Sequence, residues 1–345
     1  MDLDKKALEN ILQDILKIPS PTGYTKNVTN YIKNLLEKYQ VKYIETNKGA
    51  VSATIAGESI EEKTVTAHID TLGAMVKEIK DTGRLCITPI GSYMMNTIEG
   101  EDCTVHTLSD NVYSGTVQTI KPSVHISGDE ARDLKRSAEN MELILDEKVF
   151  SKEDVLALGI NVGDFISFDT KTKITEKGFV KSRYLDDKAS AAVLLYTIIY
   201  IKENKINLPY TTNFFFSNLE EVGIGGSSNV SSLTKEFVAV DMGAPGPNQN
   251  STEYAVSICA KDSSGPFNLE LRKKLINIAE KEGIDYRIDI YPHYSSDASA
   301  ALHAGYDIKT ALIGPGVFAS HAYERTHMDS IISTFRLLIE YLKQK

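Results

Sequence analysis

Long apolar segments, paired cysteines and an excess of basic residues are all missing from this sequence of 345 residues. The longest apolar run, from Ala189 to Ile201, is interrupted by Ser190 and Thr197 and is shorter than the roughly 18–20 residues that cross a bilayer. The N-terminus is charged and lacks the apolar core of a secretory signal. We therefore expect a cytoplasmic protein that does not enter a membrane.

The few cysteines and the charge balance exclude further classes. Cys86, Cys103 and Cys259 form no Cys-x-x-Cys pair, which favours reduced thiols over a disulfide framework. Lys and Arg number 38 against 47 Asp and Glu, so the net charge is −9. Binding to phosphate groups needs a positive field, so nucleic acid and anionic membranes are not expected as the main partners.

The hydrophobic pattern divides a chain whose length fits two domains. Residues 1–73 contain two amphipathic helices and then strands, and residues 180–345 alternate helices with strands. Residues 74–179 differ, with short β-like runs, polar turns and one short helix at 152–158. We predict one α/β domain, made of 1–73 and 180–345, that is interrupted by a β-rich domain at 74–179.

Carboxylates and imidazoles gather in short clusters of the α/β portion. The clusters contain His68 and Asp70, Asp186 and Asp187, Glu220 and Glu221, Asp241, and His321. Taken singly, such residues are usually solvated or cap a helix. Most of these clusters follow an apolar strand-like run or precede a buried helix, where an unpaired charge is costly. Ligands bind at the carboxyl ends of strands in open α/β sheets, so we predict that the clusters share one crevice.

The residue types indicate metal-assisted hydrolysis. Residues 68 and 70 point to the same side of a strand, so His68 could bind a metal while Asp70 bonds its other ring nitrogen or a water. Adjacent Glu220 and Glu221 point in different directions, so one can ligate while the other acts as a general base. Histidine with carboxylates suits Zn²⁺ or a similar divalent ion.

The order and spacing of these motifs resemble the cocatalytic two-metal peptidases called tetrahedral, deblocking or glutamyl aminopeptidases. The resemblance covers nearly the whole chain and rests on Ser20-Pro21-Thr22-Gly23-Tyr24, Ala67-His68-Ile69-Asp70, Asp186-Asp187-Lys188, Glu220-Glu221-Val222-Gly223 and the insert with its ending at 149–164. It implies a zinc-exopeptidase-like α/β/α catalytic domain with an inserted small β-barrel-like domain. It also implies a homo-oligomer joined through that insert, from a dimer up to a hollow dodecamer.

The same resemblance implies a set of metal ligands. Asp186 would bridge two divalent metal ions, with His68 and Asp241 completing one site and Glu221 and His321 the other. Zinc is the expected metal, with cobalt or manganese as alternatives. The implied activity is hydrolysis of the N-terminal peptide bond of peptides by a metal-bound hydroxide.

Two further residues receive catalytic roles from the resemblance. Glu220 would be the general base, and Asp70 would orient His68. The resemblance also suggests a non-proline cis peptide bond between Asp186 and Asp187.

The sequence departs from the family pattern near the site. Asp70 is followed by Thr71 where a second acid is usual, and Leu219 stands where glutamine is common. The last histidine motif reads His321-Ala-Tyr-Glu-Arg-Thr-His327, which makes His327 a rival ligand. We favour His321, because His327 falls where a helix N-cap begins. The departures bear on substrate choice and remove no ligand.

Other polar residues have two interpretations. His125 could reach the active site of a neighbouring subunit, or could be a partly buried structural histidine. Asp297 could shape the substrate pocket or simply open a helix. We take His106, His293 and His303 as structural.

Two other functions compete with the aminopeptidase hypothesis. A glycoside hydrolase of the endoglucanase type needs only two carboxylates and no metal, but leaves His68, Asp241 and His321 without a role. A non-catalytic assembly protein could also use the scaffold, but the complete ligand set and the base argue against it.

Overall fold

The computed structural model describes residues 3–345, which separate into two compact units. The large unit runs up to Asp70 and resumes at Lys171, and the small unit is Thr71–Thr170. We expected the insert to span 74–179, so its observed end lies earlier in the chain. The reason is that β10 (Lys173–Ile174) and β11 (Phe179–Ser182) form a small sheet with β17 (Glu324–His327) inside the large unit.

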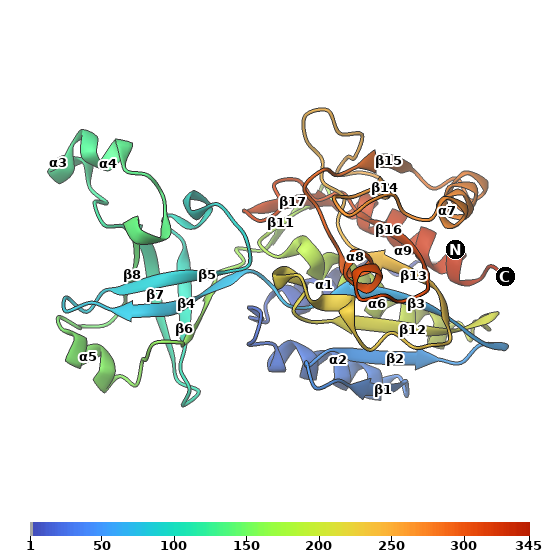
Figure 1. Ribbon diagram of the computed structural model, residues 1–345, viewed down its shortest axis with the longest axis horizontal. Coiled ribbons are helices and arrows are strands. Elements are labelled where there is room, and N and C mark those ends of the chain that lie inside the picture. Colours follow the sequence, from blue (N-terminus) through green and yellow to red (C-terminus); the bar gives the residue numbers. More distant parts are fainter. Residues whose placement is uncertain (1–2) are drawn as a thin grey trace. The chain divides into compact units, whose positions relative to one another are not determined.

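An eight-stranded mixed sheet forms the centre of the large unit (Figure 1). Its strands, in spatial order, are β1 (Lys42–Glu45), β2 (Val51–Ile55), β12 (Tyr210–Ser217), β3 (Ser59–His68), β13 (Thr234–Val240), β16 (Lys309–Pro315), β14 (Val256–Lys261) and β15 (Tyr286–Ile290). The four central strands β12, β3, β13 and β16 run parallel. Their carboxyl ends therefore lie at one edge of the sheet, where a site can form.

Helices cover both faces of this sheet. They are α1 (Lys5–Leu16), α2 (Lys26–Lys38), α6 (Leu185–Glu203), α7 (Leu269–Lys281), α8 (Asp297–His303) and α9 (Met328–Leu342). Side chains alternate along β13: Val238 and Val240 join the core that contains α6 and α9, whereas Phe237 and Ala239 join the core that contains α8. The unit is therefore a three-layer α/β/α structure, as predicted.

Helix α6 differs from the amphipathic helices because it is apolar on almost every side. Nearly all its residues are buried, and it packs against α1, α9 and β3. By contrast, α1 buries a single stripe of side chains, and the Asp4 carboxylate caps its start by accepting the Ala7 N–H. None of the helices within residues 3–345 combines the length and the apolar character that a membrane span requires.

The small unit is a closed antiparallel barrel. Its strands, in order around the barrel, are β4 (Gly73–Ile79), β5 (Leu85–Ile90), β8 (Met141–Leu145), β7 (Val112–Thr119), β6 (Asp102–His106) and β9 (Phe165–Phe168). Short helices α3 (Val124–Ser127), α4 (Asp129–Asp133) and α5 (Lys152–Ala157) lie in its connections. Alternate strand residues, such as Val105, Val117 and Leu143, fill the interior, which makes the barrel a core and not a channel.

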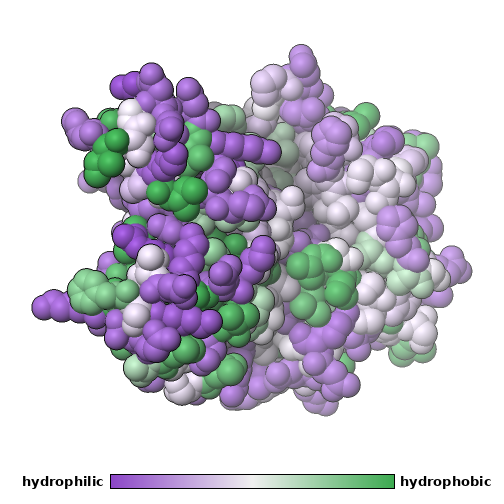
Figure 2. Space-filling view, turned by 60° about the vertical axis from the view of Figure 1, so that its left-hand side comes forward, coloured by the Kyte–Doolittle hydropathy of each residue, from purple (hydrophilic) through white to green (hydrophobic). Residues whose placement is uncertain are grey.

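Large apolar side chains are exposed on the barrel unit. Leu108 and Ile126 are each 88% exposed, and Phe150 is 80% exposed. Figure 2 shows such apolar groups as separate patches among polar side chains on the part of the surface that faces the viewer. Contiguous exposed apolar surface is typical of contact regions between proteins, whereas single exposed apolar side chains are common on any protein surface.

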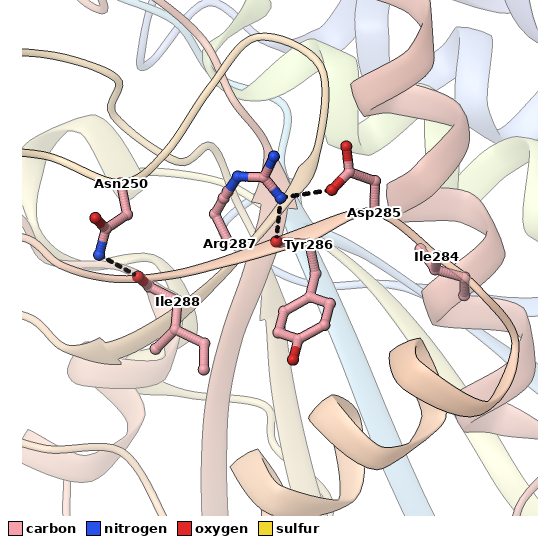
Figure 3. Close-up of a pocket in the computed structure, with 6 residues that line it drawn as sticks. All are labelled: Asn250, Ile284, Asp285, Tyr286, Arg287 and Ile288. Carbon is pink, nitrogen blue, oxygen red and sulfur yellow. Dashed lines mark hydrogen bonds and ion pairs between the residues drawn. The ribbon is translucent and has the colours of Figure 1, made fainter.

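Strand β15 is one edge of the large sheet, and side chains bond two of its carbonyl groups. The Asn250 side chain donates to the Ile288 carbonyl at 3.0 Å, and Arg287 donates to the Tyr286 carbonyl at 2.7 Å. Figure 3 shows both bonds at the rim of a surface hollow of about 600 Å³. Edge strands with free backbone groups pair with other chains, so these bonds protect the edge.

Candidate active site

The predicted site residues come together at the carboxyl edge of the central sheet. His68 is the last residue of β3, Glu220 and Glu221 lie in the turn after β12, Asp241 directly follows β13, and His321 lies in the loop after β16. Parallel pairing puts these strand ends side by side. Residues separated by more than 250 positions therefore share one site.

Asp186, near the start of α6, lies between the two histidines. Its Oδ1 atom is 3.2 Å from His68 Nε2, and its Oδ2 atom is 3.4 Å from His321 Nε2. Each histidine also faces a glutamate: Glu220 Oε2 is 3.7 Å from His68 Nε2, and Glu221 Oε2 is 3.6 Å from His321 Nε2. The peptide bond between Asp186 and Asp187 is cis, as the family resemblance suggested.

The main chain of Asp70 fixes the orientation of His68. The His68 Nδ1 atom lies 2.9 Å from the Asp70 carbonyl oxygen, which can only accept, so Nδ1 carries the proton. Nε2 then faces the Asp186 carboxylate and is the ring nitrogen that a metal could use. This is the arrangement of a histidine ligand whose second nitrogen is held by a backbone carbonyl.

The Asp70 carboxylate has a different task from the one we expected. Its Oδ1 atom is 3.8 Å from His68 Nδ1, too far for a hydrogen bond. It accepts instead the Thr22 hydroxyl at 2.7 Å and the N–H groups of Glu220 and Glu221 at 3.2 and 3.3 Å. The carboxylate therefore holds the turn that carries both glutamates, and the orienting bond to His68 comes from its own carbonyl.

The Glu324 carboxylate also holds backbone N–H groups of the site, a role that our sequence interpretation missed. Its side chain accepts the Asp186 N–H and the His321 N–H, each at 3.1 Å. The motif around His321 contains this glutamate, and its position three residues after a candidate ligand was the available signal.

Asp187 was also left without a role. Among residues 3–345, one group of His, Cys, Asp and Glu side chains places its ligand atoms all within 4.8 Å of one another, and it consists of His68, Asp187 and Asp241. Asp187 Oδ2 accepts the His68 N–H at 3.3 Å, while Oδ1 is buried without a hydrogen bond. Glu221 Oε1 is likewise buried and unbonded, so the site has carboxylate oxygens available for a cation.

The electrostatics of the site show an excess of acid. Burial raises the pKa of Glu221 to about 8 and that of Asp241 to about 7, and the Asp186 charge adds to both shifts. Burial also raises the pKa of Glu220 well above its ordinary value, with further contributions from Asp241 and Glu221. A divalent cation would relieve this repulsion, and the histidine and carboxylate donors suit one.

Asp186 behaves differently from its neighbours. Burial alone would raise its pKa, but hydrogen bonds from His321 and His68 outweigh burial and bring the pKa below the usual range. Asp186 is therefore the most strongly ionised carboxylate of the group and the one best placed between two positive charges.

Left-handed backbone conformations occur next to the site residues. Tyr184, Leu219, Ala319 and His321 all have φ between 58° and 68°. Such conformations are uncommon for residues other than glycine and are often found at functional sites. The turns that present the site residues therefore depend on the surrounding hydrogen bonds to keep their shape.

The remaining histidines lie away from this constellation or are already bonded. His327 caps α9 by accepting the Asp329 N–H, and its other nitrogen bonds the Lys177 carbonyl at 2.7 Å. His106 is buried and bonds Ser167, as expected for a structural role. His125 is exposed on α3, so it is not the partly buried histidine of our second interpretation.

Asp297 stabilises the turn after β12 that carries Glu220 and Glu221. Its buried carboxylate accepts the hydroxyls of Thr66 and Ser217 at 2.5 and 2.6 Å and the Gly226 N–H at 2.8 Å. A Cβ at Gly225 would lie 2.0 Å from this carboxylate, so the turn needs glycine there. Asp297 thus links the ends of β3 and β12 to the loop after Glu221.

Solved structures of aminopeptidases share this architecture. The TET aminopeptidase of the marine sediment archaeon Thaumarchaeota archaeon SCGC AB-539-E09 matches with a TM-score of 0.90 at 19% identity, over 99% of this chain and 97% of that chain. The TET1 peptidase of Pyrococcus horikoshii, described as assembling into a tetrahedron or a large octahedral shell, matches with a TM-score of 0.85 at 23% identity, over 98% and 100%. These likenesses establish the fold.

Sequence comparison gives the family. The model of the M42 glutamyl aminopeptidase family matches residues 49–337. The protein YhfE of Bacillus subtilis (strain 168) is 51% identical over 340 residues, which are 98% of each chain. The chain belongs to the M42 glutamyl aminopeptidase family and is a hydrolase of peptide bonds.

Proposed function

We propose that this protein is a two-metal aminopeptidase that removes the N-terminal residue of peptides. The observation that supports it is the position of Asp186, whose two oxygens lie within 3.4 Å of Nε2 of His68 and of His321. A carboxylate placed between two imidazoles, each with a further acid beside it, is a donor set for two adjacent cations.

The ligands divide into two groups around Asp186. His68 and Asp241 lie on one side, and Glu221 and His321 lie on the other. Divalent ions held there, for which zinc suits the nitrogen and oxygen donors, would activate water and polarise the scissile carbonyl. Asp187 belongs to the first group as an alternative oxygen donor.

Glu220 is our general base. Its side chain is 14% exposed against 3% for Glu221, so it reaches toward solvent while Glu221 is enclosed. Burial and the acids around it raise its pKa, which suits a group that must take up a proton and release it again. Glu220 would accept the proton of the attacking water and deliver it to the leaving amine.

The excess of acid also favours cleavage at a chain end. Acids near His68 that a bound cation leaves ionised would attract the ammonium group of a peptide N-terminus. A glycoside hydrolase, the alternative that uses only two carboxylates, has no need for the two imidazoles that face Asp186. We therefore keep the aminopeptidase reaction as the conclusion.

A substrate panel tests this function. The purified protein is stripped with a chelator, reloaded with Zn²⁺, Co²⁺ or Mn²⁺, and assayed against aminoacyl-p-nitroanilides. We expect the stripped protein to be inactive and at least one metal to restore turnover. Activity that survives complete metal removal, or no turnover with any metal, would refute the proposal.

We also propose that the barrel unit joins subunits. Support comes from its exposed apolar side chains, Leu108, Ile126 and Phe150 among them, and from the assemblies described for the Pyrococcus horikoshii peptidase. Dimers, built further into a dodecamer, are the expected states, and exposed His125 would then lie near a neighbouring subunit. Light scattering at micromolar concentration tests this proposal, since a mass near 38.1 kDa would show a monomer.

A further inference from the structure

The Glu324 carboxylate links two segments that are far apart in the chain. The residue is 2% exposed, and its two oxygens bond different partners. Oε2 accepts the N–H of Asp186 and Oε1 accepts the N–H of His321, both at 3.1 Å. Both partners carry side chains that face the proposed metal sites.

Neither partner segment is held by regular secondary structure alone. Asp186 lies at the start of α6, where the first N–H groups have no acceptor within the helix. His321 has φ of +64° in a loop that also contains Ala319 at +58°. Both N–H groups therefore need an external acceptor, and one carboxylate supplies it to both.

Glu324 itself is held firmly. It is the first residue of β17, and it pairs with Ser182 at the end of β11, four residues before Asp186. Its backbone is thereby fixed to the strand that leads into α6. The carboxylate then spans from this fixed point to the His321 loop.

We propose that Glu324 is a positioning residue that sets the separation of the Asp186 carboxylate from the His321 imidazole. This inference rests on the proposed two-metal function. It makes Glu324 the counterpart of Asp70, whose carboxylate accepts the N–H groups of Glu220 and Glu221. Two buried carboxylates, neither of them a ligand, would thus hold the backbone behind four of the site's side chains.

Two substitutions separate positioning from charge. Glu324→Gln keeps the length of the side chain but loses the charge and presents an NH₂ group to one of the two N–H donors. Glu324→Asp keeps the charge but is one methylene shorter, so it cannot reach both donors. Glu340→Gln is the matched control, because Glu340 is a buried glutamate of α9 that pairs with Lys343 outside the site.

The test measures zinc affinity as well as turnover, on the complete metal-stripped chain titrated with Zn²⁺ against a chromogenic chelator. Loss of an outer partner of a metal ligand typically costs about 10–100-fold in affinity or activity. We expect both Glu324 variants to lose zinc affinity and kcat by about this factor, with KM changed less than about threefold. Glu340→Gln should match the parent protein.

Three results would overturn the inference. Glu324→Asp could bind zinc like the parent while Glu324→Gln fails, which would assign the effect to charge alone. Both variants could keep their zinc affinity and lose only thermal stability, which would make Glu324 merely structural. Unaltered affinity, kcat and stability in both would remove any role.

A measurement on the unaltered protein covers the case in which a variant fails to fold. Hydrogen exchange followed by mass spectrometry should show slow exchange of the Asp186 and His321 amides in the metal-stripped protein. Fast exchange of both amides would refute the proposed hydrogen bonds from these N–H groups to Glu324. If the parent protein itself binds no zinc and turns over no substrate, the proposed function fails, which is a result distinct from all of these.

Discussion

Replacing Glu220 by Gln separates the proposed general base from the proposed metal ligands. Both glutamates lie at similar distances from a histidine, 3.7 Å for Glu220 and 3.6 Å for Glu221, so distance does not distinguish their roles. Exposure does, because Glu221 is enclosed beside Asp186 and His321 while Glu220 reaches toward solvent. Glu220→Gln keeps the shape of the side chain and removes its ability to take up a proton.

The expected magnitude follows from the task of the residue. General bases supply about 10²–10⁴-fold in rate, which corresponds to a rise of roughly 3–5 kcal/mol in the activation barrier. Glu220→Gln should lower kcat by that factor and leave KM and the metal content close to those of the parent. Glu221→Gln should lose metal, since it removes the charge of a proposed ligand that is 3% exposed.

The assay combines kcat on an aminoacyl-p-nitroanilide with metal content by mass spectrometry after gel filtration. Circular dichroism confirms that each variant is folded. Metal loss in Glu220→Gln together with retention in Glu221→Gln would show that we have exchanged the two roles. Full activity of Glu220→Gln would refute a base at this position.

Three further predictions test the surroundings of the site. Thr22→Val removes one hydrogen-bond donor to the Asp70 carboxylate and should lower kcat about tenfold, whereas Thr22→Ser should keep kcat near that of the parent. Thr334→Val, which removes a buried hydroxyl of α9, is the control. Equal losses of kcat in all three variants would contradict the reasoning. His327→Ala removes the N-cap of α9 and should lower the free energy of unfolding by about 0.5–2 kcal/mol with no change in metal content. A loss of metal in this variant would show that His327 is a metal ligand. Burial lowers the pKa of Lys63 to about 7, so between pH 7 and 9 the unfolded chain binds a proton that the folded chain lacks. Stability should therefore rise with pH, by up to about 1.4 kcal/mol per unit more in the parent than in Lys63→Met, and equal slopes in urea titrations would show that Lys63 stays charged.

The fold was predictable where hydrophobic spacing decides it. The α/β domain was predicted from the apolar stripe of α1 and from the apolar runs of the central strands. The change of hydrophobic pattern after β3 predicted the β-rich insert. The general β pattern of 74–179 did not locate single strands such as β8, Met141–Leu145, whose residues alternate between buried and half-buried. Strand β17, Glu324–His327, contains no aliphatic residue, so only its pairing with β11 makes it a strand.

The clustering of the candidate side chains was predictable, but the contacts that hold them were not. Residue types at strand ends pointed to His68, Asp241 and the two glutamates, because buried charges need partners. The role of the Asp70 carboxylate could not be predicted from the sequence, because it depends on where the turn after β12 places the N–H groups of Glu220 and Glu221. The role of Glu324 likewise depends on a hydrogen bond between residues that are 138 positions apart in the chain.

The insertion of the barrel directly after Asp70 has a consequence for synthesis. Strand β3, Ser59–His68, is complete early, but both strands that pair with it, β12 and β13, follow the insert. The barrel is continuous in sequence, so it can finish its hydrogen bonding while β3 still lacks both neighbours. The nascent chain therefore carries an unpaired strand, whose second half is buried in the folded protein, for at least 140 residues of elongation, which makes this the stage at which aggregation or chaperone binding is expected.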